Sequence, residues 1–197
     1  MRELIEAASL VQAELSAHGW RFCFIGGIAN LRWGTPRLTR DMDLTLLTGF
    51  GGEEPYIEAL TRRFASRVPD GPEFARRYRV LLLRTDDGTP IDIALGAMPF
   101  EERSVKRSTP FVYLPGLSLR TCSAEDLIVH KAFAARPQDW VDVEGVIVRQ
   151  QGRLEWPTIW HELEPLADLK EAPESLERLR VIANAAQDVV GPFEYGA

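Results

Sequence analysis

The stretch from Phe22 to Leu47, FCFIGGIANLRWGTPRLTRDMDLTLL, most strongly constrains how this chain can fold. It begins with a short apolar run at residues 23–25, which is typical of a buried strand. Gly26–Gly27 interrupts this run, and residues 28–33 can then begin a helix. Between Asp41 and Leu46 polar and apolar residues alternate, which is the period of a strand. We therefore predict a strand, a glycine turn, a short helix, a basic loop and a second strand.

Two carboxylates lie on the second of these strands. The strand period puts Asp41 and Asp43 on the same face, side by side. Two like charges in one place are costly unless a positive group lies between them, and a divalent metal ion is the obvious candidate. The alternative for this pair is the solvated face of an edge strand.

Length and composition limit the class of protein. A chain of 197 residues fits one domain, or a core with a small helical appendix. No apolar run is long enough for a membrane span, and the acidic N-terminus does not resemble a signal peptide. We therefore expect a cytoplasmic protein in which Cys23 and Cys122 are reduced structural thiols. The net charge of -6 argues against a general nucleic-acid-binding surface but allows a local basic patch.

The remaining pattern is mixed α/β up to about residue 120 and helical beyond it. We expect a helix over residues 53–67, a strand over 78–84 and a returning strand over 90–95. The chain should therefore consist of a mixed α/β core, residues 1–120, and a helical segment, residues 121–197.

A third carboxylate, Asp92, lies between Ile91 and Ile93 in the returning strand. If the isoleucines face the core, Asp92 points to the opposite face of the sheet. It could complete a two-metal site or act as a base on an attacking hydroxyl, or it could be a surface residue. Gly26–Gly27 allows close approach of a ligand, and the amides of the following helix favour an anion such as phosphate. The same glycines could form an ordinary tight turn.

At these residues the sequence resembles the nucleotidyltransferase superfamily with a DNA polymerase beta-like catalytic core. The pattern of that superfamily is a Gly-Gly or Gly-Ser turn, an Asp-x-Asp pair and a distal Asp on a strand. Gly26–Gly27, Asp41, Asp43 and Asp92 match it, with thirteen residues between the glycines and the first aspartate. The segments RLTRDMDL, IDIALGAMPFEERSV and SAEDLIVHKAFAARPQDWVDVEGV are similar to the AbiEii toxin-like group, which includes toxins of toxin–antitoxin and phage-defence systems.

This resemblance implies a nucleotidyltransferase-type mixed sheet flanked by helices, with the C-terminal helical segment closing the nucleotide cleft. It implies transfer of a nucleoside monophosphate from an NTP to an acceptor hydroxyl, with Mg²⁺ or Mn²⁺ held by Asp41, Asp43 and Asp92. Gly26 and Gly27 would hold the phosphates. The acceptor stays open between an RNA 3′ end, a protein and a small molecule, and a cognate antitoxin protein is a possible partner.

The same group has a lysine on the helix after the sheet and an aspartate on the next helix. Lys131 and Asp142 match these positions, and the resemblance implies that the lysine contacts nucleotide phosphates. The alternatives are a solvated helix face for Lys131 and a helix macrodipole contact for Asp142 and its neighbour Asp139. A proline between Lys131 and Asp142 prevents us from assigning them to one helical face. Arg37 and Arg40 precede the aspartate pair, and either neutralise a triphosphate or pair with acids elsewhere.

A function of another class is compatible with the same fold. The protein could bind nucleotides or a partner without catalysis, as one half of a toxin–antitoxin pair does. The complete set of three carboxylates favours the enzyme.

Overall fold

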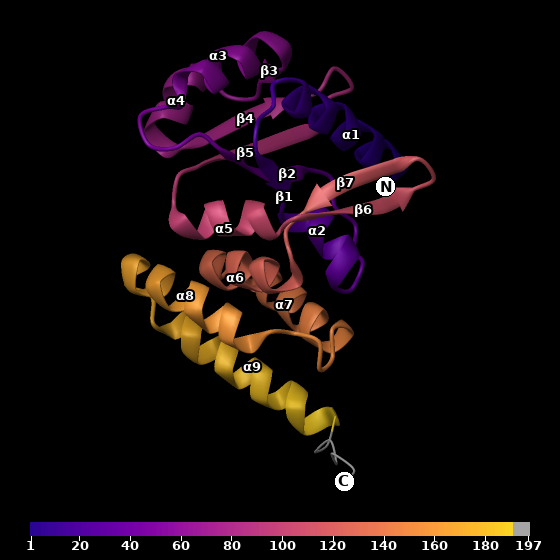
Figure 1. The fold of residues 1–197 in the computed structure, drawn as a ribbon, viewed down its shortest axis with the longest axis vertical. Coiled ribbons are helices and arrows are strands. Elements are labelled where there is room, and N and C mark those ends of the chain that lie inside the picture. Colours follow the sequence, from indigo (N-terminus) through magenta and orange to yellow (C-terminus); the bar gives the residue numbers. More distant parts are fainter. Residues whose placement is uncertain (191–197) are drawn as a thin grey trace. The chain divides into compact units, whose positions relative to one another are not determined.

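The chain forms two compact units in a computed structural model that describes residues 1–190, with side chains described up to residue 186 (Figure 1). The first unit comprises Met1–Arg32 and Arg37–Ser123. The second comprises Trp33–Pro36 and the chain from Ala124 onward. Residues 191–197 of the predicted helical segment lie outside the described residues.

A seven-stranded mixed sheet forms the centre of the first unit, in the order β3-β4-β5-β2-β1-β7-β6. Strands β2 and β5 are parallel, as are β1 and β7, and the other neighbouring pairs are antiparallel. This sheet confirms the predicted mixed α/β class. The strands are β1 (Phe22–Phe24), β2 (Met42–Leu47), β3 (Ala65–Ser66), β4 (Val80–Arg84), β5 (Pro90–Gly96), β6 (Thr109–Leu114) and β7 (Leu117–Thr121).

Five helices accompany the sheet in this unit. They are α1 (Arg2–Ala17), α2 (Gly26–Trp33), α3 (Glu54–Arg63), α4 (Gly71–Tyr78) and α5 (Pro99–Arg107). The helix predicted over residues 53–67 ends earlier because Phe64 is extended, with φ -124° and ψ 140°, and its side chain is buried. The strand predicted over 78–84 begins later because Tyr78 still belongs to α4. This helix was not predicted, because the residues at its start are typical of a turn.

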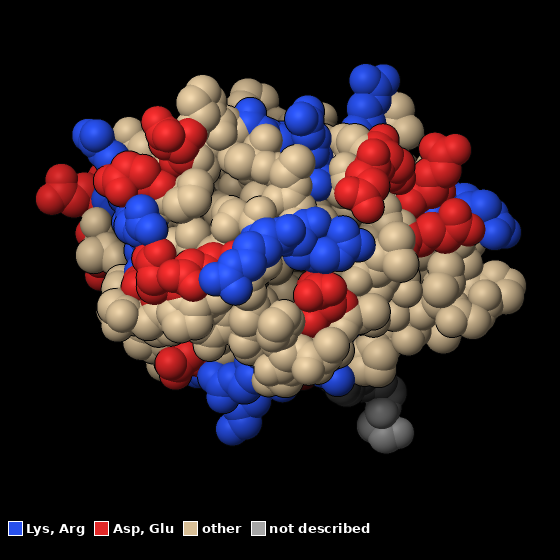
Figure 2. Space-filling view, turned by 90° about the horizontal axis from the view of Figure 1, so that it is seen from above, with Lys and Arg blue, Asp and Glu red and all other residues tan. Residues whose placement is uncertain are grey.

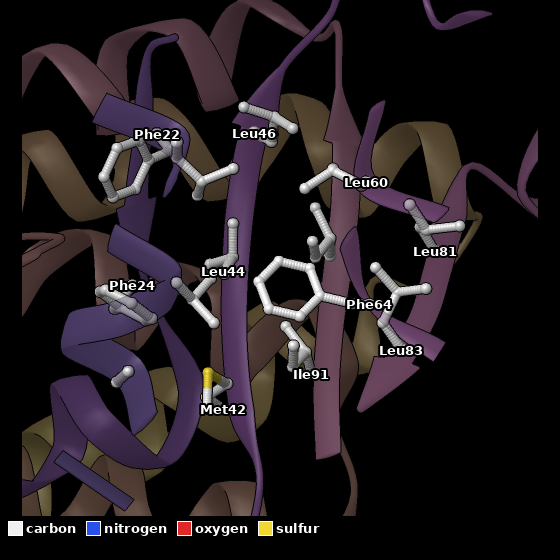
Figure 3. Close-up of a cluster of buried hydrophobic side chains, with 14 of the residues drawn as sticks. Phe22, Phe24, Met42, Leu44, Leu46, Leu60, Phe64, Leu81, Leu83 and Ile91 are labelled. Atoms are coloured by element: carbon white, nitrogen blue, oxygen red, sulfur yellow. The ribbon is translucent and has the colours of Figure 1, made fainter. Parts of the chain in front are cut away.

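The hydrophobic core covers one face of the sheet, and Figure 3 shows its side chains gathered along β1, β2 and the neighbouring strands. Met42, Leu44 and Leu46 are fully buried at alternate positions of β2, as the strand period predicts. Residues of α1, α3 and α4 belong to the same cluster. Burial of each large aliphatic side chain contributes roughly 1.5–3 kcal/mol, so this face fixes the register of the strands.

The side chains of Cys23 and Cys122 are both fully buried. No helix in the described part of the chain combines the length and apolar character that crossing a membrane requires.

The second unit is mainly helical between Ala124 and Val190, where its described residues end. Its helices are α6 (Ala124–Ala134), α7 (Pro137–Arg149), α8 (Trp156–Lys170) and α9 (Glu174–Val190). The segment Trp33–Pro36 packs within this unit, because Arg149 Nη1 donates to the carbonyl of Gly34 at 2.6 Å. Gln150 Nε2 donates to the carbonyl of Trp33 at 2.7 Å.

Candidate active site

Two of the predicted site carboxylates, Asp43 and Asp92, lie side by side on parallel strands. They are direct partners in the register of β2 and β5. Ile91 and Ile93 are fully buried in the core, so Asp92 faces the opposite side of the sheet, as the sequence predicted. Strand β2 lies between β5 and β1, so the alternative of a solvated edge strand is wrong. The fold therefore brings two carboxylates from distant parts of the sequence to one face of the sheet.

Gly26 begins α2 directly against one of these carboxylates. Its φ of +54° is a conformation that favours glycine. A Cβ atom at this position would lie 2.1 Å from Asp43 Oδ2, which is far inside van der Waals contact. The amide of Ile25 donates to the carbonyl of Asp43 at 2.9 Å and fixes the start of the helix beside β2. Glycine is therefore required here both by backbone conformation and by the approach of Asp43.

Asp41 precedes the first residue of β2 and is exposed. The hydroxyl of Thr39 donates to Asp41 Oδ1 at 3.1 Å. Thr39 is buried, and a Cβ at Gly27 would lie 2.2 Å from its Oγ1 atom. Gly26 therefore packs directly against Asp43, whereas Gly27 packs against Thr39, the residue whose hydroxyl donates to Asp41.

Arg67 is a site residue that the sequence reasoning missed. Its guanidinium forms an ion pair with Asp92 Oδ1, and both side chains are about one-third exposed. The amide of Arg67 donates to the carbonyl of Leu82 in β4 at 3.0 Å. Leu82 is the β4 partner of Asp92 in β5, so this hydrogen bond holds Arg67 beside the strand next to Asp92. Arg67 lies 25 residues before Asp92, and no local pattern relates the two positions.

The described residues contain no group of three or more His, Cys, Asp and Glu side chains that could hold a metal ion. The carboxylate oxygens of Asp43 and Asp92 are nevertheless the ligand type that Mg²⁺ prefers. Their register puts the two residues on neighbouring strands, about 4.8 Å apart. The chemistry of this pair therefore fits a divalent cation, with Arg67 as the positive group that accompanies Asp92.

Lys131 and Asp142 come together in the second unit. Lys131 Nζ lies 2.6 Å from Asp142 Oδ2 and 2.9 Å from Asp139 Oδ1. All three side chains are at least nine-tenths buried, so the alternative of a solvated helix face for Lys131 is wrong. The chain turns between α6 and α7 at Ala135, whose φ is +59°, and this break brings the lysine and the aspartates together despite Pro137.

Asp139 also caps its own helix, because the amide of Arg136 donates to Asp139 Oδ2 at 3.2 Å. This contact agrees with the predicted favourable position of an acid in the first turn. Gln138 Nε2 donates to Asp142 Oδ1 at 3.2 Å. The buried lysine is thus surrounded by two carboxylates that are themselves hydrogen-bonded, an arrangement that satisfies its charge.

The two arginines before the aspartate pair differ in their contacts. Arg37 Nη1 donates to the carbonyl of Leu38 at 3.3 Å. Arg40 is exposed, and its guanidinium pairs with no acid among the residues whose side chains the structure describes. Of the two alternatives for Arg40, pairing with an acid of this chain is therefore not observed.

Comparison with known proteins agrees with this fold. The family model described as "Nucleotidyl transferase AbiEii toxin, Type IV TA system" matches residues 9–154, which is more than half of the chain. The chain is therefore a nucleotidyltransferase. It belongs to the AbiEii family, as the resemblance of its motifs predicted.

Among solved structures, the chain is similar to an antigenic nucleotidyltransferase-like protein from Paracoccidioides brasiliensis. The two share 15% sequence identity with a TM-score of 0.50, over 91% of this chain and 93% of the other. This similarity supports the fold. A solution structure of the antibiotic-resistance factor ANT(2'')-Ia matches with 17% identity and a TM-score of 0.46, over 94% of this chain and 91% of the other. A comparison with curated proteins gives no match.

Proposed function

We propose that this protein transfers a nucleoside monophosphate from an NTP to an acceptor hydroxyl in a reaction that depends on Mg²⁺ or Mn²⁺. The observation that carries the proposal is the register of Asp43 against Asp92 on parallel strands. Two adjacent carboxylates repel each other, and a divalent cation between them removes that repulsion. The chain belongs to a nucleotidyltransferase family, which supports nucleotidyl transfer as the reaction that this carboxylate pair serves.

The catalytic roles divide among the three carboxylates. Asp41, Asp43 and Asp92 hold the divalent ions, which supply neutralisation of the charge that develops on the phosphates during transfer. Asp92 also helps to deprotonate the acceptor hydroxyl. Strands and hydrogen bonds hold these side chains before substrate arrives, so catalysis rests on positioning and electrostatics and needs no covalent enzyme intermediate.

The phosphate contacts come from the glycine turn and from cations. Gly26 and Gly27 begin a helix whose free amides favour an anion. Arg40 is exposed beside the aspartate pair and suits a triphosphate because its charge is not already neutralised by an acid of the described chain.

Lys131 and Asp142 are proposed nucleotide-binding residues on a different basis. Lys131 is paired with two carboxylates, so its ammonium is already compensated. A contact with phosphate would require the lysine to exchange a carboxylate for it. We therefore assign Lys131 and Asp142 the role of a preformed ion cluster, from which a nucleotide phosphate draws the lysine when it binds.

The biological role that follows from the family is that of a toxin in a toxin–antitoxin system, with a cognate antitoxin protein as partner. Its test is genetic. Expression of this chain alone should arrest growth, and co-expression of a small neighbouring gene should restore it. Growth arrest that persists with an Asp43→Asn variant would show that any toxicity is independent of catalysis.

The acceptor is best found by direct labelling. The protein is incubated with each α-³²P-labelled NTP, together with total cell RNA, total protein or small metabolites as separate fractions. We expect label in one fraction, release of pyrophosphate, and loss of both on addition of EDTA with recovery in excess Mg²⁺ or Mn²⁺. Heat of NTP binding in calorimetry without any pyrophosphate release would instead indicate a binding protein.

A further inference from the structure

A cavity of about 830 Å³ opens in the first unit, away from the carboxylates. Its walls come from the second half of α1, the start of β1, helix α5, and strands β6 and β7. Trp20 forms part of the wall, and its indole stacks on the His18 ring with centroids 4.2 Å apart. This volume lies within the range of about 300–1,000 Å³ that is usual for small-molecule sites.

Positive charge is concentrated around this cavity. Arg21, Arg103, Lys106 and Arg120 line it, whereas Glu102 is the sole carboxylate among its lining residues. The chain as a whole carries a net charge of -6, so the excess of cations here runs against the general balance. Figure 2 shows that basic side chains also form a band between acidic groups on one face of the molecule.

One of the four cations is held in place by residues of helix α1 and of the end of α5. Arg120 Nη1 donates to the carbonyl of Ser108 at 2.8 Å, and the Arg120 amide donates to Gln12 Oε1 at 2.8 Å. Gln12 Nε2 in turn donates to the carbonyl of Ser118 at 2.8 Å. Ser108 and Gln12 are neutral partners, so these contacts fix the arginine without cancelling its charge.

Two other cations are available to a ligand. Arg21 and Lys106 are exposed, and neither forms an ion pair with any acid among the residues whose side chains are described. Cations held close together without a counter-ion repel one another, and an anion bound between them removes this cost. The arginine fork matches phosphate oxygens in pairs, and the lysine adds a point charge.

The cavity and the carboxylate pair lie at opposite ends of the β1–β2 pair. The amide of Leu47 donates to the carbonyl of Arg21, whereas Asp43 accepts from the amide of Ile25. Leu47 follows Asp43 by four residues of strand, a distance of about 13 Å at ~3.3 Å per residue. The cations of the cavity are therefore separate from the proposed metal ligands.

We propose that this cavity binds the phosphate groups of a nucleotide-sized ligand at a second site, distinct from the carboxylates of β2 and β5. The cavity has the size of such a ligand, and its cations have the number and type that several phosphate oxygens require. Binding at this site needs no divalent metal, because the charges that compensate the phosphates are supplied by the protein.

The test is calorimetric titration of the full chain with tripolyphosphate and with ATP, in EDTA and at low ionic strength. EDTA removes the metal on which the proposed catalysis depends, so failure of this proposal and failure of the proposed function are distinguishable. We expect both probes to bind the wild-type protein. Arg21→Gln and Lys106→Gln should each weaken binding about tenfold, because each removes a charge-assisted contact.

Arg84→Gln is the matched control, since Arg84 is an exposed arginine at the end of β4 outside the cavity. This variant and Asp43→Asn should each change the affinity less than about twofold. All four changes are at exposed or half-exposed positions where the fold should persist, which circular dichroism checks.

Three results would overturn the proposal. The first is a wild-type protein that binds neither probe. The second is an equal loss of affinity in Arg84→Gln and in the two cavity variants, which would indicate general charge attraction. The third is binding of a short single-stranded oligonucleotide with no binding of ATP or tripolyphosphate, which would contradict the class of ligand.

Discussion

At Gly26 a backbone requirement and a chemical requirement coincide. The residue has φ +54°, and the carboxylate of Asp43 occupies the space that a Cβ atom would need. Gly88, in the turn between β4 and β5, has φ +87°, but no atom lies within 4 Å of the place that a Cβ would take there. A substitution at Gly88 therefore costs only the strain of a left-handed backbone. A substitution at Gly26 costs the same strain and must also displace the carboxylate of Asp43.

Gly26→Ala should thus be more damaging than Gly88→Ala. We expect Gly88→Ala to lower the free energy of unfolding by about 1–2 kcal/mol through backbone strain alone and to retain NTP turnover. Gly26→Ala should cost about 2–4 kcal/mol because steric overlap adds to the strain, and it should abolish turnover. Urea denaturation and a pyrophosphate assay measure both effects. Equal behaviour of the two variants would show that contact with Asp43 is unimportant.

Arg67 supplies a second test at the level of one residue. Its guanidinium is paired with Asp92, so it would compete with a metal ion held by that carboxylate as proposed. We expect Arg67→Gln to bind Mn²⁺ roughly three- to tenfold more tightly in electron paramagnetic resonance titrations, because a partly exposed competing ion pair is removed. Arg84→Gln should leave the affinity unchanged. Weaker Mn²⁺ binding by Arg67→Gln would contradict competition at Asp92.

At the scale of secondary-structure elements, the break between α6 and α7 brings Lys131 against Asp139 and Asp142. Removal of one member of a buried ion cluster leaves uncompensated charge. We expect Lys131→Met to lower the free energy of unfolding by about 3–5 kcal/mol, and an added Asp142→Asn change to restore part of it.

Lys106→Met is the control for this prediction, because Lys106 is exposed and should tolerate the change within about 0.5 kcal/mol. Urea denaturation of the three variants gives the comparison. If Lys131→Met were as stable as Lys106→Met, the buried cluster would not contribute to the stability of these helices.

Glu53, the residue before α3, should make the stability of the fold depend on pH. Hydrogen bonds from the amide of Glu53 itself and from Arg79 lower the pKa of the Glu53 carboxyl. A carboxyl whose pKa is lower in the folded state stabilises the fold above its unfolded-state pKa, and this contribution disappears as the pH falls through the folded-state pKa. The pair of Glu53 with Arg79 is partly exposed, so its contribution at neutral pH is about 0.5–1 kcal/mol.

Glu53→Gln should therefore be less stable than the wild-type protein at pH 7, and the difference should shrink towards pH 3. Thermal denaturation across this range measures it, with Glu58→Gln as a control in an exposed pair with Arg62. A difference that grows as the pH falls would contradict the direction of the shift.

At the scale of the whole molecule, the sequence was most informative where the pattern is local. The alternation in β5 correctly predicted that Asp92 faces away from the core, because a strand period needs only a few neighbouring residues. The order of strands was not readable in this way. It depends on pairing between distant segments, and Arg67 reaches Asp92 only because β4 lies beside β5.

Contacts between residues on either side of a helix break could not be predicted from the sequence either. Pro137 and the left-handed Ala135 end one helix and begin another, so helical phasing could not relate Lys131 to Asp142. Helix α4 was missed because its Gly-Pro start is typical of a turn. The division into two units adds Trp33–Pro36 to the helical part, a contribution that a composition shift near residue 120 cannot indicate.

The central claim is that adjacent carboxylates on β2 and β5 hold the metal for nucleotidyl transfer. The most direct measurement is pyrophosphate release from labelled NTP by the wild-type protein and by Asp43→Asn, with circular dichroism to compare their folds. Asparagine keeps the shape of the side chain and removes its charge, so we predict an intact fold with no turnover. Full turnover by Asp43→Asn would contradict the metal assignment.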